Sequence, residues 1–208
     1  MTLRLNGSTS GYTEIDAPAV AGSNTLLLPT GAGSAYQVVR NGATAGSLEF
    51  TDKIVSGTAV ASTSGTSIDF TGIPSWVKRV TVMLNGVSTS GSSKLRVQLG
   101  SGSVETSGYL GGSSAIASAS ANSAGSFSAG FDLNDTQSAA GLRRGSFTFL
   151  LFGSNLWVLS GNISVHDVGY TSLINGTKTT SGTLDRVRIT TVNGTDTFDA
   201  GSINILYE

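Results

Sequence analysis

Apolar residues recur at every second position, or in short runs, along most of this chain. The clearest example is the segment 186–192, in which Val187 and Ile189 alternate with Arg186 and Arg188. Successive side chains of a β-strand point to opposite faces, so this segment would bury one face and leave the other in water. No segment shows the three- to four-residue spacing of an amphipathic helix. The pattern therefore predicts an all-β protein.

Turn-forming residues separate the apolar segments at short and fairly even intervals, which is typical of a β-sandwich or barrel. Asn-Gly pairs at 85–86, 175–176 and 193–194 follow apolar segments, and this dipeptide favours the type I′ turn of a β-hairpin. The expected strands are Leu3–Leu5, Tyr12–Ile15, Thr25–Leu28, Tyr36–Arg40, Ile54–Ala61, Ser67–Phe70, Lys78–Leu84, Leu95–Leu99, Ser126–Leu133, Ser146–Phe152, Leu156–His166, Tyr170–Ile174, Arg186–Val192 and Ile203–Tyr207.

A change of composition near Phe50 predicts two parts. Residues 1–50 carry short apolar segments among Gly, Ala, Ser and Thr, and they are too few to build a stable core alone. The run Leu26–Leu28 nevertheless favours burial, so we expect this segment to pack on sister chains, as a homotrimer, or on a scaffold. Residues 51–208 would form a jelly-roll-like antiparallel β-sandwich. The alternative is that residues 1–50 add strands to that sandwich.

The stretch from Gly100 to Gly125 consists largely of Gly, Ser and Ala, with Tyr109, Leu110 and Ile116 as its large apolar residues. A loop of this length is uncommon in a compact domain and tends to be functional or mobile, so it is the first candidate for a binding surface. The alternative is a strand with small side chains that crosses a crowded oligomer axis.

The composition favours a neutral, hydrogen-bonding surface. Charged residues make up 12% of the chain, against about 25% in typical globular domains, whereas Ser and Thr number 57 and Gly 28. The net charge of −1 argues against nucleic acid as a partner. No apolar run approaches the roughly 18 residues of a membrane helix, so no membrane insertion is expected. Neutral glycans or protein subunits suit such a surface better than phosphates do.

The groups that acid–base catalysis requires are scarce. The single histidine, His166, precedes Asp167, and adjacent strand residues point to opposite faces, which argues against a catalytic triad. Two carboxylate pairs, Asp132 with Asp135 and Asp196 with Asp199, could cleave a glycan, but they fit turn capping better. The segment 132–135 offers oxygen ligands without the rest of a calcium loop. We therefore expect no enzyme activity, no metal and no cofactor.

Four residues are the candidates for ligand binding. Tyr109 lies in the Gly/Ser stretch, where its ring could be exposed and stack on a sugar. Trp157 could do the same, although its apolar neighbours favour a place in the core. Arg143 and Arg144 could bind a carboxylate, or else begin a solvated strand or form an ion pair between subunits. Trp76, at the entry to a strand, is expected to pack against a sheet edge.

Several segments of the chain resemble virion fibre and tail-associated structural proteins of tailed bacteriophages, particularly cyanophage-like ones. The segments Leu3–Gly11 and Thr25–Pro29 resemble a short amino-terminal module that recurs in such proteins. The segments Ile68–Pro74 and Leu184–Gly201 resemble a carboxyl-terminal β-domain found there too. The resemblance implies a virion protein with a possible role in host attachment, and it supplies no catalytic or ligand residues.

The sequence thus predicts a non-enzymatic virion protein. Its amino-terminal segment would attach to sister chains and other virion proteins, and its sandwich would contact a host-surface glycan or protein. One alternative is an architectural baseplate or capsid decoration subunit that touches no receptor. A third hypothesis is a polysaccharide depolymerase, although the chain lacks the repeated coils of a β-helix.

Overall fold

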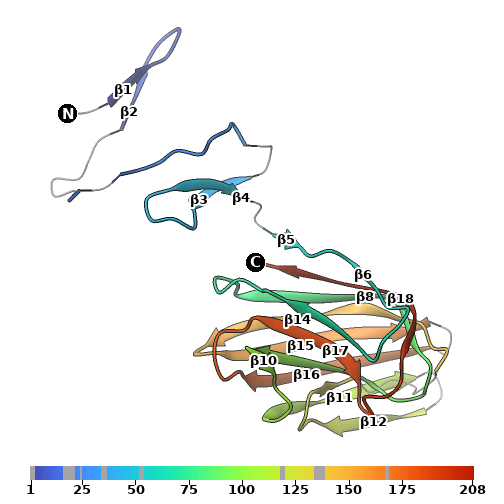
Figure 1. Cartoon of the computed structure of the whole chain (residues 1–208). Helices are drawn as coiled ribbons and strands as arrows, with labels where there is room; N and C mark the ends of the chain where they lie inside the picture. The colour runs from blue at the N-terminus through green and yellow to red at the C-terminus, as the bar shows by residue number, and fades with distance from the viewer. Residues whose placement is uncertain are drawn as a thin grey trace. The chain divides into compact units, whose positions relative to one another are not determined.

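The computed structural model describes residues 3–15, 22–23, 25–33, 37–51, 54–117, 120–133, 139–166 and 169–208, with the backbone alone for 120–124. Every pair of named strands is antiparallel, which confirms the all-β prediction. The chain divides into two compact units, Met1–Lys53 and Ile54–Glu208 (Figure 1). The sequence had placed this division after residue 50.

The unit Met1–Lys53 contains two short hairpins. Strand β1 (Leu3–Asn6) pairs with β2 (Tyr12–Ile15), and β3 (Val38–Asn41) pairs with β4 (Leu48–Thr51). The strand expected at Thr25–Leu28 is reduced to a single parallel bridge between Leu27 and Ser47. No described residue of this unit is buried. The unit therefore has no hydrophobic core of its own within the described part of the single chain.

The unit Ile54–Glu208 contains two larger sheets. The larger has nine strands in the order β12-β11-β16-β15-β14-β8-β18-β5, with β6 also on β18. These are β5 (Val55–Ser56), β6 (Val60–Ala61), β8 (Arg79–Thr89), β11 (Tyr109–Ala117), β12 (Ser120–Ser126), β14 (Arg143–Gly153), β15 (Leu156–Val165), β16 (Tyr170–Thr179) and β18 (Phe198–Tyr207).

The smaller sheet has five strands in the order β10-β9-β17-β7, with β13 also on β9. These are β7 (Ser67–Thr71), β9 (Leu95–Ser101), β10 (Ser103–Val104), β13 (Phe131–Asp132) and β17 (Arg186–Thr191). Along β17 the burial alternates as the sequence predicted: Val187 and Ile189 are fully buried, while Arg186 and Arg188 lie on the outer face.

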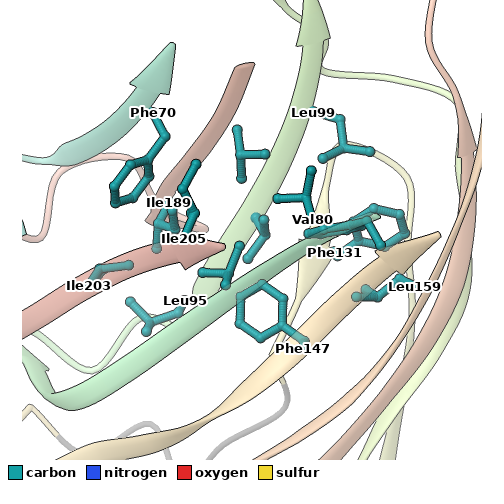
Figure 2. Close-up of a cluster of buried hydrophobic side chains, with 14 of the residues drawn as sticks. Phe70, Val80, Leu95, Leu99, Phe131, Phe147, Leu159, Ile189, Ile203 and Ile205 are labelled. Carbon is teal, nitrogen blue, oxygen red and sulfur yellow. The ribbon is translucent and has the colours of Figure 1, made fainter. Parts of the chain in front are cut away.

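One hydrophobic core joins the two sheets. It contains Leu95 and Ile189 from the smaller sheet together with Phe147, Leu159 and Ile205 from the larger one, and Figure 2 shows these side chains gathered in one cluster. Two antiparallel sheets that bury their facing sides against each other form a β-sandwich. The narrower expectation of a jelly roll stays a prediction.

Two of the three Asn-Gly pairs lie inside strands, so the expectation of three hairpin turns is wrong. Asn85-Gly86 lies in β8, where Gly86 has a φ of 67° and the pairing with β14 shifts register at the neighbouring position. Asn175-Gly176 lies within β16, paired with β11 and β15, and the rings of Phe127 and Phe131 lie close to Gly176. Only Asn193-Gly194 forms a turn, and it leads from one sheet to the other.

The stretch from Gly100 to Gly125 is not a loop. It contains β10, β11 and most of β12, so the expectation of a long binding loop is wrong and the alternative of strands with small side chains is confirmed, while their place at an oligomer axis stays a prediction. Gly and Ser have low β propensity, but tertiary packing outweighs propensity here. Along β11 the small side chains of Ser113 and Ala115 are buried. Small residues allow β11 to pair closely with β12 and β16 at once.

Candidate functional site

The aromatic side chains that the sequence offered for ligand binding are buried. Tyr109 begins β11, and only 1% of its surface is exposed. Its hydroxyl accepts a hydrogen bond from Leu99 N (2.8 Å) and donates one to Glu105 O (2.8 Å). Trp157 in β15 is 2% exposed and belongs to the core, which was the favoured of its two interpretations. Neither ring can stack on a ligand.

The two arginines at the start of β14 face opposite sides of the sheet. Arg143 is fully buried and donates to Gly141 O at 3.1 Å, whereas Arg144 is half-buried. The interpretation of these residues as a solvated strand start is therefore wrong for Arg143, and binding of a carboxylate or an ion pair between subunits stays a prediction. Arg143 pairs with Val165, eight positions of β15 or about 27 Å from Trp157. The structure does not bring the predicted arginines and aromatic residues together.

A buried ion pair lies beside Tyr109. Lys178 Nζ is 2.5 Å from Glu105 Oε2, and their side chains are 6% and 16% exposed. Burial alone would raise the pKa of Glu105, but hydrogen bonds from Lys178 and from the backbone and side chain of Ser181 outweigh it, so the pKa lies below its usual value of 4.5. Burial raises the pKa of the Tyr109 hydroxyl. This cluster ties β11 and β16 to the segment after β10 and offers no open site.

The candidate catalytic carboxylates are engaged in structural contacts. Asp132 pairs with Arg96, and Asp199 accepts a hydrogen bond from Ser88 Oγ. Asp196 accepts hydrogen bonds from Asn193 Nδ2 (2.7 Å) and from Ser93 N (2.9 Å). Both bonds lower the pKa of Asp196, and the bond from Asn193 has the larger effect.

Some of the residues that the sequence analysis named together with these carboxylates and with His166 lie outside the described residues. This is true of Asn134, Asp135 and Asp167, whereas His166 is described and exposed. In the described part of the chain, no three acidic or histidine side chains are grouped as a metal site would require.

A shallow polar hollow of about 280 Å³ lies on the outer face of the five-stranded sheet. Its floor comes from neighbouring positions of three strands, because Arg188 pairs with Asp69 and Gln98, and Thr190 pairs with Ser67 and Arg96. We call this surface the polar hollow. It is lined by Thr66, Ser67, Arg96, Gln98, Arg188, Thr190, Thr191, Val192, Asn193 and Gly194.

Two bidentate ion pairs flank the floor of the polar hollow. Arg188 donates from Nε (2.6 Å) and Nη2 (2.7 Å) to the two carboxylate oxygens of Asp69. Arg96 donates in the same way to Asp132, at 2.6 and 2.9 Å. The hydrogen bond to its carboxylate is the largest cause that raises the pKa of each arginine. Both guanidinium groups are therefore charged, and each is neutralised by its partner.

The rest of the polar hollow is also fixed by hydrogen bonds. Gln98 is 6% exposed and donates from Nε2 to Ala129 O (2.8 Å), while Thr190 Oγ1 donates to Thr66 O (2.8 Å). The turn at Asn193 forms one wall, because Asn193 Oδ1 accepts from Thr195 N (3.1 Å) and its backbone N donates to Ser93 Oγ (3.0 Å). Val192, 39% exposed, adds an apolar side chain.

One aromatic pair is partly open to solvent elsewhere on the sandwich. Trp76 is 39% exposed, and its ring lies 5.9 Å from that of Tyr207 in β18. Trp76 therefore packs on a ring of the last strand, which is paired on both sides and is not the sheet edge that the sequence predicted, and it still exposes part of its indole.

A row of paired positions with an exposed leucine at each end crosses the outer face of the nine-stranded sheet. Leu150 pairs with Val158, which pairs with Thr177, which pairs with Leu110. Leu110 is 67% exposed and Leu150 is 47% exposed. Val158 and Thr177, which lie between the two leucines, are half-buried.

The hairpin β1–β2 has one apolar and one polar face. Leu3 pairs with Ile15 and Leu5 pairs with Thr13, so these side chains share one face, on which Leu3, Leu5 and Ile15 are 53–58% exposed. On the other face, Arg4 forms an ion pair with Glu14 at 2.5 Å and lies 4.0 Å from the centre of the Tyr12 ring. The charged side chains Arg4 and Glu14 pair with each other within the hairpin, whereas the apolar side chains of the other face stay exposed.

The segment 26–28, which precedes β3, exposes a second apolar surface. Leu26, Leu27 and Leu28 are 63–70% exposed. An adjoining hollow of about 250 Å³ is lined by Leu27, Leu28, Pro29, Thr30, Gly31, Leu48, Glu49 and Phe50. Burial of three leucines from water would stabilise a complex by about 1.5–3 kcal/mol each, so this surface fits a protein partner.

Comparison with protein families, with curated proteins and with solved structures finds no match for this chain. Among the residues that the structure describes, no helix is both long and apolar enough to span a membrane.

The polar hollow was missed in the sequence because its residues are far apart along the chain. The alternation around Arg188 did indicate which side chains lie on the outer face of β17. Only the order of β7, β17 and β9 in the sheet brings Ser67, Gln98 and Arg188 together, and a sequence pattern does not determine that order.

Proposed function

We propose that this chain is a structural, non-enzymatic component of a virus particle, of the fibre or tail-associated type found in tailed bacteriophages. The unit Met1–Lys53 attaches to sister chains, as a homotrimer, and to other virion proteins. The sandwich Ile54–Glu208 faces outward and contacts the host surface. The resemblance of Leu3–Gly11 and Leu184–Gly201 to segments of such proteins supports this proposal.

The observation that carries the proposal is the absence of any buried residue among the described residues of Met1–Lys53. A two-stranded hairpin is marginally stable at best in water, and a unit of this size without disulfides needs another surface to pack on. Eight of its large apolar side chains are exposed: Leu3, Leu5, Tyr12, Ile15, Leu26, Leu27, Leu28 and Val39. The sandwich, by contrast, has a complete core of its own. The two units therefore suit two tasks, assembly and outward contact.

The carboxylates add support for a non-enzymatic role. Asp132 is neutralised by a bidentate arginine, and Asp196 and Asp199 hold turns and strand ends. A glycosidase requires two carboxyl groups that face each other across a cleft and reach the substrate. The described carboxylates act instead as hydrogen-bond acceptors within the fold.

Antibody labelling of intact virus particles tests this function. Antibodies raised against residues 54–208 should label projections on the particle in electron micrographs, and the purified full chain should compete with particles for adsorption to host cells. Labelling within the shell or baseplate, without competition, would instead indicate the architectural subunit. Absence of the chain from purified particles would refute the proposal altogether.

A further inference from the structure

We infer that the polar hollow is a binding site for neutral glycans. The inference rests on the proposed function, in which the sandwich contacts the host surface, and it names the site and the ligand class. The volume of about 280 Å³ lies just below the range of small-molecule sites, roughly 300–1,000 Å³.

The hydrogen-bonding groups of the polar hollow match hydroxyl groups. In each bidentate pair the arginine donates from Nε and Nη2. Within the described residues, Nη1 of Arg96 and Nη1 of Arg188 have no acceptor and can donate to a ligand. Gln98 Oε1 likewise has no donor in the described part of the chain. The surface thus offers donors beside acceptors, and a sugar hydroxyl both donates and accepts.

The charges of the polar hollow favour a neutral ligand over an anion. Arg96 and Arg188 are each neutralised by a carboxylate within 2.9 Å, so the four groups have no net charge. An acidic sugar would have to displace Asp69 or Asp132, or lose its hydration next to them. A neutral sugar can bind without either cost.

The polar hollow is held in place before a ligand arrives. Arg188, Arg96, Gln98 and Thr190 each make a hydrogen bond to another group of the sandwich. Side chains that are already ordered lose little conformational entropy on binding, which favours weak ligands such as sugars. Val192 supplies an apolar group for the C–H face of a sugar ring.

A glycan array read with the labelled full chain tests this inference. The array carries neutral oligosaccharides of glucose, galactose and mannose and acidic ones that contain uronic or sialic acid. The wild-type chain should bind neutral members. The double variant R188Q/D69N, which removes one ion pair without leaving a lone charge, should bind them at least about tenfold more weakly.

The matched control is R186Q/D185N. Arg186 lies on the same strand and the same face as Arg188, and its partner Asp185 directly precedes that strand, but neither residue lines the polar hollow, so binding should be unchanged. Amide hydrogen exchange of the wild-type chain with a bound neutral glycan gives a second readout that needs no variant. Protection should increase in β9, β17 and the turn at Asn193.

The inference is overturned by binding confined to acidic glycans, by equal binding of R188Q/D69N and the wild type, or by protection confined to the surface of Trp76. The oligomeric mass of the same preparations is measured in parallel. An assembled chain that binds no neutral glycan refutes the site and leaves the proposed virion role standing. Failure to assemble challenges that role instead.

Discussion

At the scale of single residues, contacts between strands determine which residue type a position can hold. Gly176 shows this in the centre of β16. A β-carbon at this position would lie 2.5 Å from Leu110 O and 2.9 Å from Cε1 of Phe131. Leu110 O belongs to a paired strand and cannot move alone. The glycine is therefore required by the close approach of β11 and of a core ring.

Replacement of Gly176 by alanine should destabilise the sandwich by about 1–3 kcal/mol, because the added methyl group overpacks the core. The matched control is Gly125→Ala, since Gly125 lies in β12 and a β-carbon added there would meet no atom of the described residues within 4 Å. Urea unfolding followed by tryptophan fluorescence measures both free energies. Equal stability of the two variants would show that the close contacts at Gly176 are not rigid.

The pair of Glu105 and Lys178 makes stability depend on pH. The pKa of Glu105 is lowered in the folded protein, so its contribution to stability is present above the usual value of 4.5 and is lost as the pH falls below it. Glu105→Gln leaves Lys178 without its partner at any pH. The variant should therefore be less stable than the wild type at about pH 7, and the difference should shrink by about pH 3. A difference that does not change with pH would contradict this account of the pair.

At the scale of elements, the pattern of apolar positions predicts strands better than it predicts their ends. The predicted strand Leu156–His166 corresponds to β15, Leu156–Val165, because it alternates around buried positions. The predicted end of Tyr170–Ile174 falls five residues short of the end of β16, because Asn175-Gly176 resembles a turn in isolation. The Gly and Ser residues of β11 likewise resemble a loop when that segment is considered alone. Local propensity misleads wherever a strand requires small side chains for packing.

The apolar face of the β1–β2 hairpin should be needed for assembly. Leu5→Ser combined with Ile15→Ser removes two exposed apolar side chains from that face, and each is worth about 1.5–3 kcal/mol when buried. The oligomer should then dissociate at concentrations at least about tenfold higher, as measured by analytical ultracentrifugation. Arg4→Gln with Glu14→Gln alters the opposite face, and an exposed ion pair of this kind contributes about 0–1 kcal/mol. Similar masses for both double variants would exclude the apolar face from the interface.

At the scale of the whole molecule, the sequence predicts the all-β class and the weak amino-terminal unit but not the site. The class follows from the alternation of residues such as Val187 and Ile189, and the weak unit follows from the short apolar segments that lie among Gly, Ala, Ser and Thr in residues 1–50. The burial of Tyr109 and the contact of Arg96 with Asp132 depend on which strands become neighbours. The order of the strands in the sheets is a property of the folded sandwich. The sequence therefore indicates loop aromatic residues as candidates, whereas the polar hollow is found only in the structure.

The central claim is that Met1–Lys53 assembles the molecule while Ile54–Glu208 folds alone. Light scattering during gel filtration, applied to the full chain and to a chain that begins at Ile54, tests it most directly. The account predicts a trimer for the full chain and a folded monomer for the shorter one, because the sandwich has a complete core of its own and Met1–Lys53 has no described buried residue. A full chain that is monomeric, or a trimer that persists without residues 1–53, would contradict it.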